Sequence, residues 1–65
     1  MSEDPREIIN QLIIEADADL QAKNIDQAFE KYKLARSKAE TINWQERVMQ
    51  IDQMIADYNK KEAEK

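Results

Sequence analysis

Hydrophobic residues recur along the chain with the period of an α-helix in three successive segments. At 100° per residue, the apolar side chains of each segment fall on one face. The first apolar stripe contains Ile9, Leu12, Ile13, Ala16 and Leu20, the second Ile25, Ala28, Phe29, Tyr32, Ala35, Ala39 and Ile42, and the third Trp44, Val48, Ile51, Ile55 and Tyr58, with Met54 at its edge. No segment alternates with the period of two residues that is typical of a strand. The pattern therefore predicts an all-α fold of three amphipathic helices.

Each predicted helix is preceded by a capping signal, in which an Asp or Asn is followed three residues later by Glu or Gln. The capping residues are Asp4, Asn24 and Asn43, and Pro5 suits the first position of the first helix. These signals predict helices over residues 5–22, 24–42 and 44–60, followed by a polar tail over 61–65. Because the chain contains no glycine, we expect short turns and antiparallel neighbours. The expected architecture is a single domain over residues 1–65, either a three-helix antiparallel bundle or a helical hairpin with a third helix.

Composition narrows the range of functions. A chain of 65 residues is too short to enclose a large active site. It contains no His and no Cys, so the usual zinc ligands, thiolate nucleophiles and imidazole bases are absent, as are disulfides. We therefore expect a protein that is not an enzyme and that uses no metal or other cofactor. No apolar run approaches the roughly 20 residues of a membrane span, and no secretory leader is evident, so we expect a cytoplasmic location.

Charge is distributed unevenly over a net charge of −4. Acidic side chains dominate residues 1–22, whereas basic side chains outnumber acidic ones in residues 23–42. This arrangement favours pairing between the first two helices if they are antiparallel. Nucleic acid is not an expected partner of a net-acidic chain, because such binding depends on neutralising phosphates. The acidic first and third segments also argue against contact with a membrane.

The second predicted helix and the turn before it resemble a tetratricopeptide repeat. That repeat places a small residue, an aromatic residue four positions later and a second small residue three positions after that. The residues of this chain that fit the pattern are Ala16, Ile25, Ala28, Tyr32 and Ala35. The chain departs from the family in lacking its glycines, in having Lys23 in the turn and in placing Asp19 at the aromatic position of the first helix. Residues 44–58 would then resemble the capping helix that closes such arrays.

The same residues also resemble the microtubule-interacting and transport domain, a three-helix module. Its turn reads Ala-Lys-Asn, as residues 22–24 do here, although the connection to the third helix is shorter in this chain by about ten residues. Both resemblances imply that a partner helix or an extended peptide docks in a groove between helices. An unrelated helical bundle remains a third interpretation.

Three apolar residues lie off the stripes, one on each predicted helix: Ile14, Leu34 and Met49. Single exposed apolar residues are ordinary, but one on each helix is also the arrangement expected of a contact with a partner or with a second copy. Lys31 and Lys38 belong to a basic region that would suit an acidic peptide or an anionic lipid, or that serves as a solvated flank of the helix. The prediction is a non-catalytic adaptor or assembly module that binds another protein. The alternative is a small structural homo-oligomer, in which exposed apolar residues bury one another.

Overall fold

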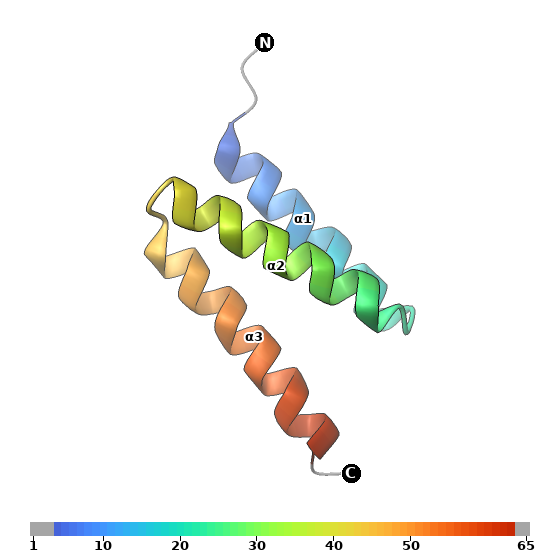
Figure 1. Cartoon of the computed structure of the whole chain (residues 1–65). Coiled ribbons are helices and arrows are strands. Elements are labelled where there is room, and N and C mark those ends of the chain that lie inside the picture. The colour runs from blue at the N-terminus through green and yellow to red at the C-terminus, as the bar shows by residue number, and fades with distance from the viewer. Residues whose placement is uncertain (1–3, 64–65) are drawn as a thin grey trace.

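The structure is a computed structural model that describes residues 4–63 of the chain. It consists of three helices, α1 (Pro5–Gln21), α2 (Ile25–Thr41) and α3 (Gln45–Ala63), with no strand among the described residues (Figure 1). Successive helices run antiparallel and are joined by short turns, so α1 and α3 run in the same direction. The prediction of an all-α, three-helix antiparallel fold is confirmed. None of these helices combines the length and apolar character needed to cross a bilayer.

The helix ends agree with the sequence prediction to within a few residues. The largest difference is at the end of α3, which continues to Ala63 and so includes residues 61–63 of the predicted polar tail. This segment contains no glycine or proline to stop the helix, and Lys60 and Lys61 interact favourably with the negative end of the helix dipole. Residues 64 and 65 of the predicted tail lie outside the described residues.

Only one of the three predicted side-chain caps forms. The Asp4 side chain accepts a hydrogen bond of 2.9 Å from the Arg6 backbone N–H at the start of α1. Asn24 precedes α2 but makes no side-chain capping bond. The prediction that Asn43 caps the third helix is wrong, because α3 begins at Gln45 and leaves Trp44 at the position before it. Asn43 instead has a φ of 57° and follows Ile42, the C-cap residue of α2.

Both turns reverse the chain in the same way. Lys23 and Asn43 adopt left-handed φ angles of 70° and 57° just after a helix end. In each turn the next residue donates its backbone N–H back across the last helical turn, from Asn24 to the Asp19 carbonyl and from Trp44 to the Ala39 carbonyl, both at 2.8 Å. This is the hydrogen-bonding pattern of a Schellman motif, which usually has glycine at the left-handed position. The chain thus makes two tight reversals with residues that pay a conformational penalty there.

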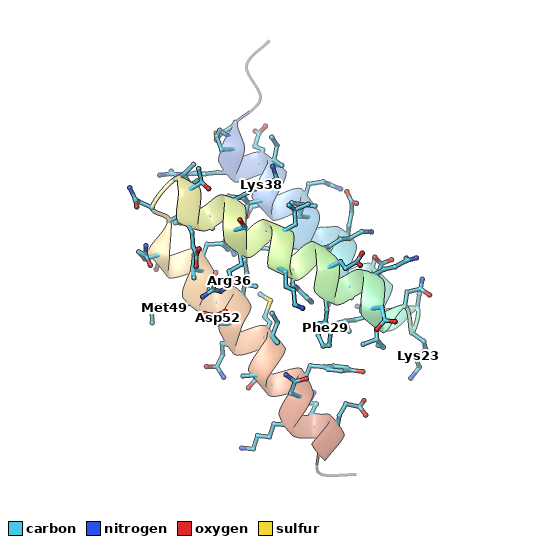
Figure 2. The ribbon with its side chains drawn as sticks, viewed as in Figure 1. Lys23, Phe29, Arg36, Lys38, Met49 and Asp52 are labelled. Carbon is cyan, nitrogen blue, oxygen red and sulfur yellow. The ribbon has the colours of Figure 1, made fainter. Side chains whose placement is uncertain are left out.

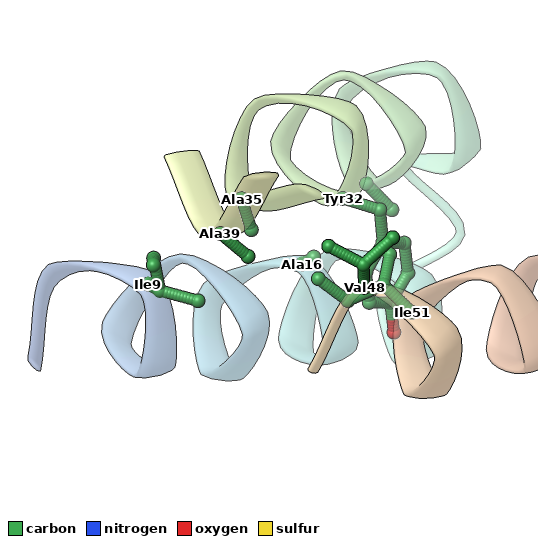
Figure 3. Close-up of a cluster of buried hydrophobic side chains, with 8 residues drawn as sticks. Ile9, Ala16, Tyr32, Ala35, Ala39, Val48 and Ile51 are labelled. Atoms are coloured by element: carbon green, nitrogen blue, oxygen red, sulfur yellow. The ribbon is translucent and has the colours of Figure 1, made fainter. Parts of the chain in front are cut away.

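The hydrophobic core lies along α2, which packs against both of the other helices. No Cα atom of α1 comes within 8 Å of one of α3 over the described residues. Figure 3 shows the cluster where the three helices meet. Its fully or almost fully buried members are Ile9, Ala16, Ala28, Tyr32, Ala35, Ala39, Val48 and Ile51. All eight lie on the stripes predicted from the sequence, so the periodicity identified the core correctly.

Polar and aromatic contacts connect α2 to its two neighbours. Towards α1, Lys31 Nζ lies 2.7 Å from Asp19 Oδ2. This ion pair confirms the expected attraction between the acidic first helix and the basic second one. Towards α3, Arg36 Nε donates to Asp52 Oδ1 at 2.6 Å (Figure 2), and the rings of Phe29 and Tyr58 meet edge to face with centroids 5.3 Å apart. The two sets of contacts fix α2 between its partners.

Candidate docking groove

A groove with a volume of about 550 Å³ separates α1 from α3. It exists because these helices pack on α2 rather than on each other. Its lining residues come from all three helices: Ile13, Ile14, Asp17 and Leu20 from α1, Tyr32 from α2, and Met54, Asp57, Tyr58 and Lys61 from α3. Most of these side chains are apolar or aromatic. The groove is therefore a hydrophobic trough with charged residues along its walls.

Tyr32 forms the floor of the groove. Its side chain is only 3% exposed and extends from α2 into the space between α1 and α3, with the hydroxyl oxygen farthest from α2 (Figure 3). Burial raises the pKa of Tyr32 above its ordinary value of 10.0, and the negative charge of Asp17 raises it further. The floor is therefore uncharged at neutral pH, with a carboxylate close enough to influence it.

Two exposed apolar side chains face the groove from opposite walls. Ile14 on α1 is 61% exposed, and Met54 on α3 is 37% exposed. Ile14 lies off the apolar stripe of α1, and Met54 lies at the edge of the stripe of α3. Because α1 and α3 do not come close to each other, both side chains stay exposed in the groove.

The apolar residues singled out from the sequence are exposed, as predicted, but they do not meet on one surface. Ile14 lines the groove. Leu34 is 48% exposed and lies about 200° around α2 from the groove floor, Tyr32. Met49 is 69% exposed and points away from α2 in Figure 2. Only Ile14 therefore belongs to the groove, and a role for Leu34 or Met49 in binding stays a prediction.

The two predicted basic contacts also separate. Lys31 is engaged within the molecule, with Asp19 Oδ2 at 2.7 Å and Glu15 Oε1 at 3.7 Å. The hydrogen bond to Asp19 is the main reason why the pKa of Lys31 is raised. Lys38 lines a smaller hollow between the start of α1 and the end of α2, beside Pro5 and Ile8. Because its charge is already paired, Lys31 is a poor receptor for an acidic peptide.

Sequence reasoning missed the charged residues of the groove: Asp17 on one wall, and Asp57 with Lys61 on the other. Each lies on the same side of its helix as an exposed apolar residue. Asp17 follows Ile14 by three positions in α1, and Asp57 and Lys61 follow Met54 by three and seven positions in α3. That spacing is visible in the sequence. What the sequence does not show is that α1 and α3 pack on α2 in such a way that these residues line one groove.

The lining of the groove combines apolar, aromatic and charged side chains. Within the described residues, no three His, Cys, Asp or Glu side chains are grouped so that they could hold a metal ion. The groove offers apolar side chains, two carboxylates, one ammonium group and two tyrosine side chains. Such a lining suits the docking of a peptide or helix with matching apolar residues.

Comparisons with known proteins leave the family of the chain open. No protein-family model matches the sequence, and neither a curated protein nor a solved structure is significantly similar to it. Three antiparallel helices occur in many all-α domains. The arrangement alone therefore distinguishes neither the tetratricopeptide-repeat resemblance nor that to the microtubule-interacting and transport domain.

Proposed function

We propose that this protein is a non-catalytic adaptor or assembly module that binds a helical or extended segment of another protein in the groove between α1 and α3. The observation that carries the proposal is the pair of exposed apolar side chains, Ile14 and Met54, on opposite walls of an apolar trough. An amphipathic segment laid in the trough would cover both side chains. A cytoplasmic setting forms part of the same proposal.

The two family resemblances support the same kind of activity. Both families dock a partner helix or extended peptide between helices, and the residues that carry the resemblance include Tyr32, which forms the groove floor. The competing occupant is a second copy of the chain, as in a structural homo-oligomer. The net charge of −4 opposes close self-association.

Light scattering over an approximately hundredfold concentration range separates these occupants. A constant mass near 7.7 kDa, with unchanged helicity by circular dichroism, is expected of a chain whose groove is free for another protein. A mass that rises with concentration, with helicity lost on dilution, would favour the homo-oligomer.

A matched pair of variants then tests the groove itself. The probe is a capped, amphipathic peptide of Leu and Gln of about 14 residues, roughly four helical turns. We expect Ile14→Gln to weaken its binding and Leu34→Gln, on the outer side of α2, to leave it unchanged. NMR shift changes on peptide addition should concentrate at the groove residues of α1 and α3. The opposite ranking of the two variants would place the binding surface on the outside of α2 and overturn the proposal.

A further inference from the structure

We infer that the segment received by the groove is a cationic amphipathic helix, with Lys or Arg side chains about one turn away from its apolar anchors. The inference rests on the proposed function and specifies its partner class. It follows from the two groove carboxylates, Asp17 and Asp57, which project from opposite walls. Cationic side chains of a docked segment would be attracted to both carboxylates.

These two carboxylates differ from others on the same helices. Asp19 is paired with Lys31, and Asp52 with Arg36. In contrast, neither groove carboxylate forms an ion pair within the described part of the chain. Their contacts are neutral amides one turn away along the same helix: Gln21 Nε2 lies 3.3 Å from Asp17 Oδ2, and Gln53 Nε2 lies 2.9 Å from Asp57 Oδ1. With two carboxylates and the single ammonium group of Lys61, the groove lining keeps a net negative charge.

The order of side chains along the groove places these charges relative to the apolar anchors. α1 and α3 run in the same direction. On both walls the exposed apolar residue, Ile14 or Met54, therefore comes before the carboxylate in that direction. Asp17 and Asp57 each follow three residues later, which is about 4.5 Å along a helix axis. Both walls therefore present an apolar contact and then an acidic one. A docked helix would match them with residues three or four positions apart.

Other occupants fit this charge pattern less well. A second copy would bring its own net charge of −4 to an acidic groove. An acidic peptide would meet two carboxylates and a single ammonium group, that of Lys61 at the far end. Charge complementarity therefore favours a cationic helix.

The test compares three fluorescein-labelled, end-capped peptides of about 14 residues that share one Leu pattern and carry Lys, Glu or Gln on the polar face. Anisotropy titrations in about 20 mM and about 200 mM NaCl measure affinity and its screening by salt. We expect the Leu/Lys peptide to bind about tenfold more tightly than the Leu/Glu peptide at low salt, with the difference shrinking at high salt.

Two charge-matched variants locate the effect. Asp57→Asn removes one negative charge from the groove and keeps the side-chain size, whereas Glu30→Gln removes one from the exposed far side of α2, about 200° around the helix from Tyr32. We expect Asp57→Asn to lower the affinity for the Leu/Lys peptide by about three- to tenfold. Glu30→Gln should lower it by less than about twofold. Circular dichroism checks that both variants keep their helicity.

The outcomes separate the inference from the proposed function. Equal affinity for the Lys and Glu peptides, or equal effects of Asp57→Asn and Glu30→Gln, would overturn the cationic partner. If Ile14→Gln still weakened binding in that case, the groove would remain the docking site. A lack of binding by all three peptides, or binding insensitive to Ile14→Gln, would overturn the proposed function as well.

Discussion

Helix α2 is packed on two sides, and its two interfaces differ in kind. α1 lies close to α2 over more of its length than α3 does. On α2, Lys31 contacts α1, whereas Arg36 contacts α3 from about 140° further around the helix. The helical projection places Ala28, Ala35 and Ala39 between these two directions. Small side chains there allow the backbones of α1 and α2 to approach closely.

The interface between α2 and α3 contains larger apolar and aromatic side chains from both helices. Val48 and Ile51 enter the core from α3, and the rings of Phe29 and Tyr58 meet near its far end. In Figure 1 the end of α3 diverges from the α1–α2 hairpin. The α1–α2 interface is thus the close one, and the α2–α3 interface opens towards the end of α3. The groove lies between α1 and α3 because both helices pack on α2 and not on each other.

The largest predicted effects come from truncating one buried isoleucine in each of the two interfaces of α2. Ile9 and Ile51 are both 0% exposed, on α1 and α3 respectively. Replacing either by Ala should lower the free energy of unfolding by about 2–5 kcal/mol in urea titrations, because it removes buried methyl groups and leaves a cavity. Amide hydrogen exchange should show that Ile51→Ala releases α3 first, with protection kept in α1 and α2. Uniform loss across all three helices would mean that the two interfaces act as one unit.

Enlarging a small residue should disrupt the close interface. Ala35 is 0% exposed, and replacing it by Leu should cost about 1–3 kcal/mol of unfolding free energy, because the extra methyl groups force α1 and α2 apart. Ser37→Leu on the exposed side of the same helix is the control and should cost nothing, since Leu is the better helix former. Thermal melts of the two variants compare them directly. An Ala35→Leu protein as stable as the parent would show that the α1–α2 interface has spare volume.

Substitutions in the two turns should have a smaller effect of the opposite sign, a gain in stability. Lys23 and Asn43 occupy equivalent left-handed positions, at φ 70° and 57°. Lys23→Gly should raise the free energy of unfolding by about 0.5–1 kcal/mol, because glycine adopts this conformation without the Cβ penalty. Asn43→Gly should gain less, since Asn tolerates the left-handed region better than Lys does. Urea titrations of the two single variants provide the ranking, and a larger gain at Asn43 would contradict it.

The smallest expected effect is alkaline destabilisation. The pKa of Tyr32 is raised above 10.0, mainly by burial, and that of Lys31 above 10.5, mainly by its hydrogen bond to Asp19. Below about pH 10 both groups hold their protons in the folded and unfolded states, so their contribution to stability is constant. Above that pH the unfolded chain releases these protons first, and stability falls. Thermal melts between about pH 8 and pH 11 should show this decline, with a shallower slope for Tyr32→Phe. A slope unaffected by Tyr32→Phe would show that Tyr32 does not contribute.

Local sequence rules identified much of the fold but only part of the candidate site. Periodicity placed Ile14 off the apolar stripe of its helix, and the structure finds it exposed in the groove. The same rule selected Leu34 and Met49, which lie elsewhere, because periodicity describes each helix separately. It also assigned Tyr32 to the core, which is correct, without showing that the ring would form a groove floor. Lys31 was assigned to a free surface because its ion pair depends on a residue of another helix.

The sequence by itself determined the three helices, their antiparallel order and the buried stripes. These features depend on side-chain period, capping signals and turn length, all of which are local along the chain. Only the tertiary structure decided that Ala39 and Ile51 share a core while α1 and α3 stay apart. It likewise decided that Asp17 and Asp57 face the same groove. Those outcomes depend on how closely two helices can approach, which is set by the sizes of side chains that meet from distant parts of the chain.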